Sequence, residues 1–228
     1  MTPVGTVVGG ITDSPESRPV VASTTRFSGR IIDVRTDEVL LHDNGQEPVE
    51  RDYVVHPGAV AVIAIDDDDA ILLVHQYRHA VGATLWEPPA GILDVDDEDP
   101  LVAARRELHE ETNAVADDWR TLVDIFTSPG ASNEVVRIYL ARQITIQGDD
   151  GRHERVHEEL DMPVAWVPLA DAVAATLAGD VGNPLLTSGV LAAEAARTSA
   201  GGFDALRPAD AEWPARTWAQ PRGAPERM

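Results

Sequence analysis

Two apolar runs dominate the first half of the chain. They cover residues 59–65 (Ala-Val-Ala-Val-Ile-Ala-Ile) and 71–78 (Ile-Leu-Leu-Val-His-Gln-Tyr-Arg), and four aspartates at 66–69 separate them. Short apolar runs bounded by turn residues are typical of buried strands. The pattern therefore predicts two strong strands joined by a polar turn. The four aspartates also suggest a second metal site, but aspartate is a common turn residue and the turn is the favoured interpretation.

Weaker patterns predict the remaining strands. Alternation over residues 27–41 indicates a strand pair before the two strong strands. Three further apolar runs, at 122–126, 135–141 and 164–167, predict strands in the second half. Residues 86–90 (Trp-Glu-Pro-Pro-Ala) are expected to form a loop.

The pattern changes to a helical period after residue 99. Asp99 is suited to the N-cap and Pro100 to the first helical position, where its missing N–H is not needed. Three apolar residues at helical spacing would form the buried stripe: Leu101, Ala104 and Leu108. Asn113 is expected to end this helix, because asparagine tolerates the left-handed conformation common at helix ends.

Two more helices are predicted near the C-terminus. They cover residues 169–178 and 184–197, and the second has Asn183 as its cap and Pro184 at its first position. Together with the strands, they indicate an α/β fold in which helices flank a mixed sheet.

The chain divides into four expected parts. Residues 1–24, rich in Gly, Ser, Thr and Pro, should be flexible, and residues 25–56 should form a small N-terminal β segment. Residues 57–197 should form the main domain, and residues 198–228, rich in Pro, Gly and Ala, an irregular tail.

Composition excludes several classes of protein. The 228 residues include no cysteine, which rules out a thiol nucleophile, a zinc–thiolate site and disulfides. No apolar run approaches the length needed to span a bilayer, and no N-terminal signal pattern is present, so a cytoplasmic protein is expected. The net charge is −21 and arginine is the only strongly basic residue, so nucleic acid and membranes are not expected partners. A polyanionic substrate would need local arginines and cations.

Three glutamates crowd the predicted helix after residue 99. Glu107 and Glu111 lie four residues apart and share a helix face, with Glu110 beside them. Such like charges repel each other unless a cation supplies the missing charge, and oxygen ligands suit Mg²⁺ or Mn²⁺. The alternative is a solvated acidic face that contains an Arg106–Glu110 pair at i,i+4 spacing.

The wider spacing favours the metal site. Gly91, Glu98 and the run Arg106-Glu107-Leu108-x-Glu110-Glu111 together resemble the Nudix box, the signature of hydrolases of nucleoside-diphosphate compounds. The family usually has five residues between the glycine and the first glutamate, where this chain has six, and it usually closes the box with glycine, where this chain has Asn113. The extra residue lies in a loop, and neither departure removes a ligand.

Residues outside the box resemble the ADP-ribose pyrophosphatases of this family, in particular the actinobacterial type. They are the run 76–79 (Gln-Tyr-Arg-His), the run 86–91 (Trp-Glu-Pro-Pro-Ala-Gly) and Pro129, sixteen residues after Asn113. This resemblance implies a Nudix α/β/α sandwich with a mixed central sheet, and an N-terminal β segment exchanged in a homodimer. It also implies Mg²⁺-dependent hydrolysis of ADP-ribose to AMP and ribose 5-phosphate.

The resemblance assigns roles to the residues of the box. Glu107 and Glu111 would be the principal metal ligands, the backbone carbonyl of Ala90 would complete the set, and Glu110 would be a further ligand or would support the others. Arg106 would hold the glutamates in place. Glu98 would order the loop, and Gly91 would open the box.

Groups outside the box are expected to complete the site. The general base would be Glu158 or Glu159, in an acidic loop that is equally well explained as exposed surface. Arg78 and Arg51 are predicted to contact the diphosphate, with Arg51 coming from the same or from the partner subunit. Pro129 would border the substrate, and Phe27 or Trp86 would stack on adenine. For each aromatic, a place in the core or in a dimer interface is an alternative.

Other chemistries have weaker support. Residues 153–157 match the His-Glu-x-x-His zinc pattern, but they follow a turn rather than starting a helix, so a chance match is favoured. Phosphate-binding, dinucleotide-binding and nucleophile-elbow glycine motifs are absent from the sequence. Two alternatives to ADP-ribose hydrolysis stay open: hydrolysis of another nucleotide, such as a nucleotide sugar, NADH or a nucleoside triphosphate, and nucleotide binding without catalysis.

Overall fold

The computed structural model of this protein describes residues 9–42, 47–95, 97–148 and 162–220. It contains three sheets: β1-β2-β3, β10-β5-β6 and β11-β8-β9-β4-β7. The strands are β1 Val20–Ser28, β2 Asp33–Val39, β3 Val49–Val55, β4 Ala59–Ala64, β5 Ala70–Arg78, β6 Ala83–Glu87, β7 Ala90–Ile92, β8 Ala114–Phe126, β9 Val135–Ile146, β10 Val164–Pro168 and β11 Arg207–Pro208. The helices are α1 Pro100–Thr112, α2 Leu169–Ala178, α3 Pro184–Thr198, the short 3₁₀ helix η2 Gly202–Ala205 and α4 Pro214–Trp218.

Strand β4 lies at the centre of the molecule. It pairs in parallel with β9 and antiparallel with β7, so the sheet is mixed as predicted. All six of its residues are buried, because alternate side chains enter two different cores. Ile63 packs with Leu186 and Val190 of α3 on one side, and Val62 belongs to the core beneath α1 on the other.

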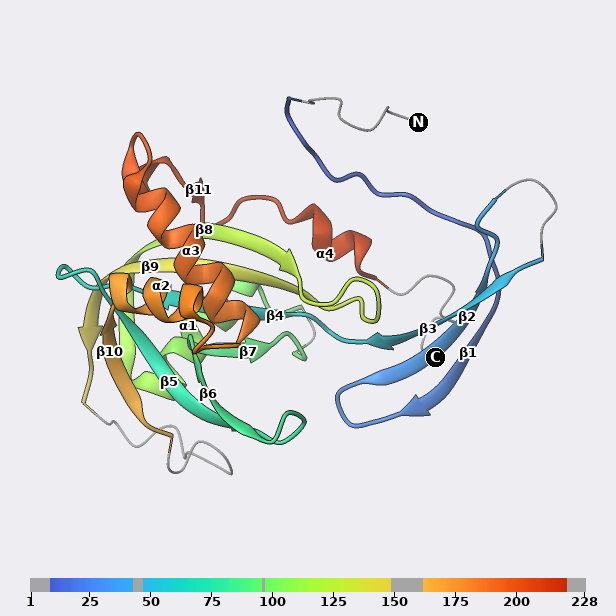
Figure 1. Ribbon diagram of the computed structural model, residues 1–228, viewed down its shortest axis with the longest axis horizontal. Coiled ribbons are helices and arrows are strands. Elements are labelled where there is room, and N and C mark those ends of the chain that lie inside the picture. The colour runs from blue at the N-terminus through green and yellow to red at the C-terminus, as the bar shows by residue number, and fades with distance from the viewer. Residues whose placement is uncertain (1–8, 43–46, 96, 149–161, 221–228) are drawn as a thin grey trace.

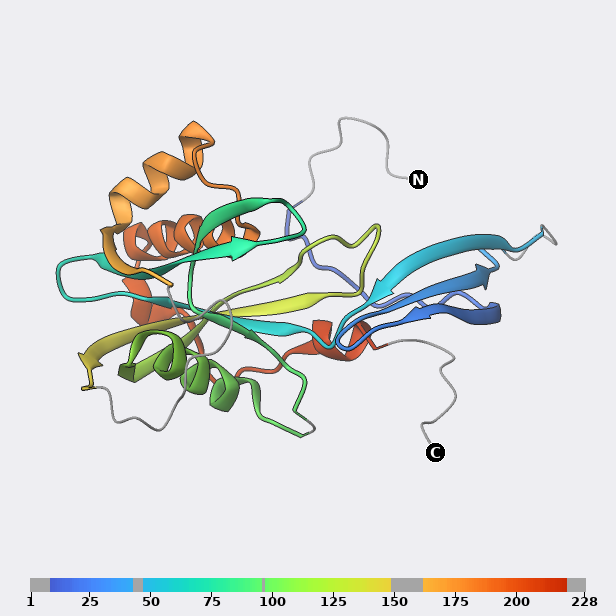
Figure 2. The ribbon, with the colours of Figure 1, turned by 90° about the horizontal axis from the view of Figure 1, so that it is seen from below.

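The helices form the outer layers of the main body. In Figure 2, α2 and α3 cover one face of the sheets and α1 covers the opposite face. This arrangement confirms the predicted α/β/α sandwich. Gly189 allows the close approach of α3 to β4, since a Cβ there would lie 2.6 Å from the Ile63 side chain.

The polar turn between β4 and β5 is also confirmed. A backbone bond from the Asp66 N–H to the Ala70 carbonyl closes it, and the Asp66 side chain accepts the N–H groups of Asp68 and Ala70. The turn leads the chain from the central sheet into the β10-β5-β6 sheet. The prediction of a loop at 86–90 is wrong, because residues up to Glu87 pair with β5 and Ala90 begins β7. Only the two prolines, which lack N–H donors, interrupt the pairing.

The strands β1, β2 and β3 form an N-terminal arm that extends away from the body (Figure 1). Of the strand pair predicted over residues 27–41, only β2 lies wholly within that range. Its antiparallel partner β1 lies earlier in the chain, in a register that includes Thr25 opposite Arg35. The arm begins at Val20, earlier than the predicted boundary at residue 25. Eight of the nine residues of β1 are exposed, so backbone pairing rather than a core holds this strand.

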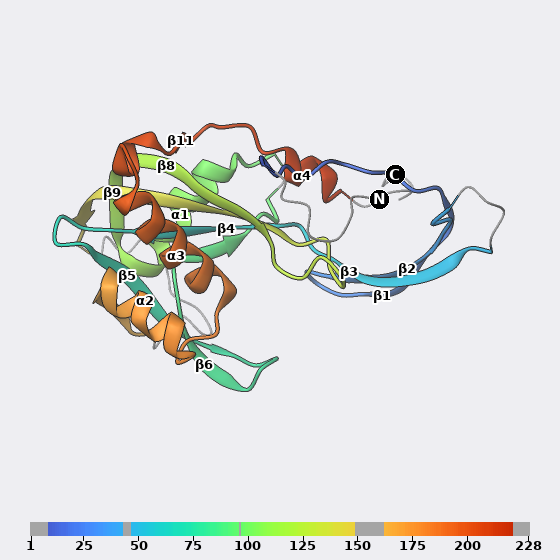
Figure 3. The same cartoon turned by 45° about the horizontal axis from the view of Figure 1, so that its top comes forward.

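Residues 199–220, the described part of the C-terminal tail, contain η2, β11 and α4, where the sequence predicted an irregular segment. The tail pairs with β8 through β11 and then reaches the arm through α4 (Figure 3). The guanidinium of Arg137 anchors the tail by donating to the carbonyls of Ala211 and Glu212, and it lies 4.8 Å from the ring centre of Trp213. These contacts join residues more than 70 positions apart, so the composition of the tail could not reveal them.

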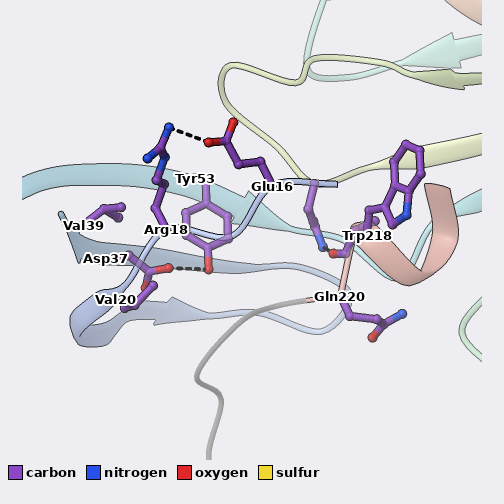
Figure 4. A pocket seen from close by; sticks show the side chains of 10 residues that line it. Glu16, Arg18, Val20, Asp37, Val39, Tyr53, Trp218 and Gln220 are labelled. Atoms are coloured by element: carbon purple, nitrogen blue, oxygen red, sulfur yellow. Dashed lines mark hydrogen bonds and ion pairs between the residues drawn. The ribbon is translucent and has the colours of Figure 1, made fainter. Parts of the chain in front are cut away.

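The α4 end of the tail borders a hollow of about 250 Å³ beside the arm (Figure 4). Trp218 and Gln220 line it from one side, and Tyr53 and Asp37 line it from the arm. The Tyr53 hydroxyl donates to the Asp37 carboxylate at 3.0 Å, and burial with this carboxylate raises the pKa of Tyr53. In the described part of the chain, no helix is both long and apolar enough to cross a membrane.

Candidate active site

Helix α1 begins and ends where the sequence predicted. The Asp99 carboxylate accepts the N–H groups of Leu101 and Val102, at 2.8 and 3.3 Å. Asn113 adopts the left-handed conformation with φ of 56°, and its N–H bonds the His109 carbonyl. Both helix ends are thus determined by local residues, and they hold the three glutamates in a fixed helical register.

Gly91 brings β7 against the acidic face of α1. A Cβ at this position would lie 2.1 Å from Oε1 of Glu107, so any other residue would displace that carboxylate. The neighbouring Ala90 N–H donates to Oε2 of Glu111 at 3.2 Å. The glycine that opens the box is therefore required by the close packing of a strand on a carboxylate.

Arg106 connects three carboxylates of the box. It donates to both oxygens of Glu98, at 3.1 and 3.0 Å, to Glu107 at 2.7 Å and to Glu110 at 3.0 Å. The hydrogen bond to Glu98 is the largest influence on the guanidinium and raises its pKa. The contact between Arg106 and Glu110 is the i,i+4 ion pair that a solvated acidic helix face would also contain. Here the same arginine also contacts Glu98 and Glu107, as expected if it holds the glutamates of the box in place.

The donor set of the box fits a hard divalent cation. Glu107, Glu110 and Glu111 offer carboxylate oxygens from one helix, Glu111 is only 7 % exposed, and β7 adds a close backbone. Among the described residues, no three His, Asp or Glu side chains already surround a common point. Arg106 now neutralises Glu107 and Glu110, so a cation would share those carboxylates with it.

A cavity of about 320 Å³ borders β7. Its described lining comes from the ends of several strands and from the start of α3: His56, Ala59, Arg78, Glu87, Ala90, Gly91, Ile92, Thr127, Glu134, Asn183, Pro184 and Leu185. Ala90 and Gly91 contact the α1 carboxylates and also line the cavity. The acidic helix and the cavity therefore share β7 as a common wall.

Arg78 reaches this cavity in an ion pair that the sequence analysis missed. Its guanidinium donates to both oxygens of Glu87, at 2.9 and 2.5 Å. Glu87 is 1 % exposed, whereas Arg78 is 45 % exposed. The sequence feature that could have revealed this pair is Glu87 itself, a single carboxylate between the apolar residues 85–86 and two prolines.

A second polar group of the cavity was also missed. The Glu134 carboxylate accepts the hydroxyl of Thr127 and lies 3.6 Å from Nδ1 of His56. Burial lowers the pKa of His56, and the Glu134 carboxylate opposes this shift. Asn133 fixes this wall, because its side chain accepts the His56 N–H at 2.8 Å and donates to the Ala219 carbonyl of the tail at 2.6 Å.

Several predicted substrate contacts lie elsewhere in the single chain. Trp86 stacks on His75 with ring centres 4.4 Å apart and is not among the described residues that line the cavity. Arg51 and Pro129 border a different cavity, of about 380 Å³, between the arm and α4. Phe27 lies on the arm and is 58 % exposed.

Glu158 and Glu159 lie outside the residues that the structure describes, and so does the His-Glu-x-x-His run at 153–157. The assignment of the general base therefore stays a prediction.

Comparisons with known proteins agree with this geometry. The NUDIX domain model matches residues 55–186. The chain is 45 % identical to the ADP-ribose pyrophosphatase of Mycobacterium tuberculosis (strain ATCC 25618 / H37Rv), over 85 % of this chain and 89 % of that protein. It is 36 % identical to the ADP-ribose pyrophosphatase of Bacillus subtilis (strain 168), over 67 % and 80 %. A crystal structure of an ADP compounds hydrolase matches with a TM-score of 0.63 at 20 % identity, over 81 % of this chain and 96 % of that one, and supports the fold.

Proposed function

The chain belongs to the NUDIX domain family, and on that premise we propose that it hydrolyses the pyrophosphate bond of ADP-ribose to AMP and ribose 5-phosphate. One observation of the structure carries the proposal. The Arg78 guanidinium lines the same cavity as Ala90 and Gly91. The Ala90 N–H donates to Glu111, and Gly91 packs against the Glu107 carboxylate. A diphosphate in this cavity would lie between an arginine and a carboxylate set suited to a cation. The two ADP-ribose pyrophosphatase relatives support ADP-ribose as the substrate.

The box residues would hold the cation. Glu107 and Glu111, with the carbonyl of Ala90 and with Glu110 as a further ligand or support, would bind Mg²⁺, or Mn²⁺ in its place. When bound, such an ion neutralises phosphate charge and lowers the pKa of water. Arg106 would keep the carboxylates oriented through its four hydrogen bonds, and Glu98 would tie the preceding loop to α1.

The reaction breaks one P–O bond of the anhydride. Water attacks one phosphorus, the other phosphate leaves with the bonding electron pair, and the proton of the water passes to a base, for which Glu158 or Glu159 is proposed. Arg78 would bind the diphosphate and offset the charge that builds on the leaving phosphate. We further propose that the protein acts in the cytoplasm as a homodimer, in which exchanged arms would bring Arg51 of one subunit to the site of the other. Pro129 would border the substrate, and Phe27 or Trp86 would lie beside the adenine.

A substrate panel tests this proposal directly. The purified protein would be incubated with Mg²⁺ and ADP-ribose, nucleotide sugars, NADH or nucleoside triphosphates, and the products would be separated by chromatography. AMP and ribose 5-phosphate from ADP-ribose, formed faster than products of the other compounds, are expected. Faster hydrolysis of a different compound would reject ADP-ribose as the substrate. Nucleotide binding without any product would indicate a binding protein.

A further inference from the structure

Glu87 is a buried carboxylate to which the proposed chemistry gives no role. It lines the cavity, and its described partner is the Arg78 guanidinium. A buried ion pair contributes little to stability compared with apolar side chains of similar size, because both charges must be removed from water. The presence of a carboxylate at this position therefore points to a role other than stability.

The strand register shows what the pair does to Arg78. Arg78 is the last residue of β5, next to the turn at the tip of the β5–β6 hairpin, and it lies opposite Ala83. Glu87 is the last residue of β6, at the base of the hairpin, and it lies opposite Val74. Side chains alternate along a strand, so Arg78 and Glu87 lie on one face and extend toward each other along it.

This geometry directs the guanidinium. An arginine at the tip of a hairpin has many accessible rotamers, and most of them point into solvent. The Glu87 carboxylate draws it back along the strand, into the cavity that β7 also lines, and the two parallel hydrogen bonds set the plane of the guanidinium. Arg78 thus has a fixed orientation in the cavity although it is the more exposed partner.

We propose that Glu87 is a positioning residue that acts through Arg78: it holds the guanidinium in the orientation in which it meets the substrate diphosphate. The proposal rests on the proposed function, because it requires Arg78 to contact a diphosphate. Glu87 itself would not touch the reacting atoms. Its effect on catalysis would exist only while Arg78 is present.

Removal of the charge separates positioning from electrostatic attraction. Glu87→Gln keeps the size of the side chain but removes the negative charge that faces Arg78, so the cavity becomes more positive. Attraction alone predicts tighter binding of an anionic substrate and an unchanged kcat. Loss of positioning predicts a kcat about 10- to 100-fold lower with a KM that does not rise. We expect the second result.

A double-mutant cycle then tests whether Glu87 acts through Arg78. The wild type, Glu87→Gln, Arg78→Gln and the double variant would be compared for kcat and KM on the substrate preferred in the panel. The double variant should match Arg78→Gln within about twofold. A double variant whose loss equals the product of the two single losses would overturn the proposal, and so would a Glu87→Gln kcat within about twofold of wild type.

Asp124→Asn provides the matched control. Asp124 is the carboxylate of another buried arginine pair, with Arg137, and it does not line the cavity in the described part of the protein. This variant should lower the melting temperature and leave kcat within about twofold. A similar loss of kcat in Asp124→Asn would show that any broken buried pair lowers activity, and would overturn the positioning role.

Failure of the proposed function can be distinguished from failure of the positioning role of Glu87. If wild type hydrolyses no compound of the panel, that function fails, and the cycle is repeated with ADP-ribose affinity measured by calorimetry. The positioning role then predicts equal affinity for Arg78→Gln and the double variant. An independent further loss in the double variant would overturn it.

Discussion

Two clusters of arginine and carboxylates, built from the same groups, differ in what they can do. The box cluster consists of Arg106 with Glu98, Glu107 and Glu110, so one arginine serves three carboxylates. The tail cluster consists of Arg137 and Arg207 with Asp124, so two arginines serve one carboxylate. The box cluster has excess negative charge and the tail cluster has excess positive charge.

The arginines of the two clusters also differ in what surrounds them. Arg137 is 3 % exposed, and two backbone carbonyls and the Trp213 ring complete its contacts. The guanidinium of Arg106 is 33 % exposed, and the carboxylates of both clusters remain partly accessible to solvent. A cluster whose arginine is surrounded by backbone carbonyls and an aromatic ring holds the tail to the body, whereas a cluster with surplus carboxylates can accept a cation. The ratio of arginines to carboxylates, rather than the residue types, distinguishes the structural cluster from the proposed metal site.

The largest effect should come from Glu111→Gln, which removes a predicted ligand beside the box cluster. We expect turnover of ADP-ribose to fall on the order of 1000-fold, because the glutamine neither binds a cation well nor balances its charge. Glutamine retains an oxygen that can accept the Ala90 N–H, so the fold should persist. Initial rates and circular dichroism measure the two quantities. Glu194→Gln, on the exposed face of α3, is the control, and wild-type turnover in Glu111→Gln would contradict the proposed ligand set.

Arg137→Met tests the tail cluster. The variant loses the pair with Asp124 and leaves two carbonyls without their donor, so unfolding should require about 3 kcal/mol less free energy. Urea denaturation measures this loss. The exposed pair of Arg197 with Glu194 provides the control, since Arg197→Gln should change stability by less than about 1 kcal/mol. If Arg137→Met were as stable as wild type, the tail would not depend on this cluster.

Mg²⁺ should stabilise the protein through the box cluster. At about 100 times its dissociation constant, an ion that binds only the folded state adds about 2.7 kcal/mol to the free energy of unfolding. Melting curves with increasing Mg²⁺ and with a chelator measure this shift. Glu107→Gln should reduce it strongly, whereas Arg137→Met should retain it. An equal shift in all three proteins would place the bound ion elsewhere.

Gly91→Ala should have a smaller effect that is specific to the box cluster. The added Cβ would overlap the Glu107 carboxylate, and a flexible side chain can move aside. We expect kcat to fall about 10-fold, since a small displacement of a positioned group lowers the rate without abolishing it. Gly189→Ala is the matched control, because its Cβ would meet Ile63 in the core and should lower the melting temperature while preserving kcat. Unchanged kcat in Gly91→Ala would mean that the position of Glu107 is not critical.

The box could be predicted because its information is local. Asp99, Pro100 and Asn113 define α1 through contacts within a few residues, and the helical register then places the glutamates together. The strands β4 and β5 were predicted for the same reason, since continuous apolar runs and a turn of aspartates are visible within twenty residues. The spacing of the box residues indicated the family before any contact was known.

The rest of the site depended on contacts between distant segments. The cavity brings together residues of the β3–β4 connection, of β5 to β7, of the segment before β9 and of the start of α3, and no local pattern shows that these meet. Glu87 became a partner of Arg78 only through the register of β5 and β6. The order of the tail required the donors of Arg137, far away on β9.

The sequence by itself therefore determined the three main helices, the strands β4 and β5, the family and the acidic face of α1, because capping, periodicity and spacing act over a few residues. The tertiary structure alone decided which arginine faces the cavity, which carboxylate orients it and which segment closes against the body. Those outcomes depend on strand register and on burial, and both arise only when distant parts of the chain pack together.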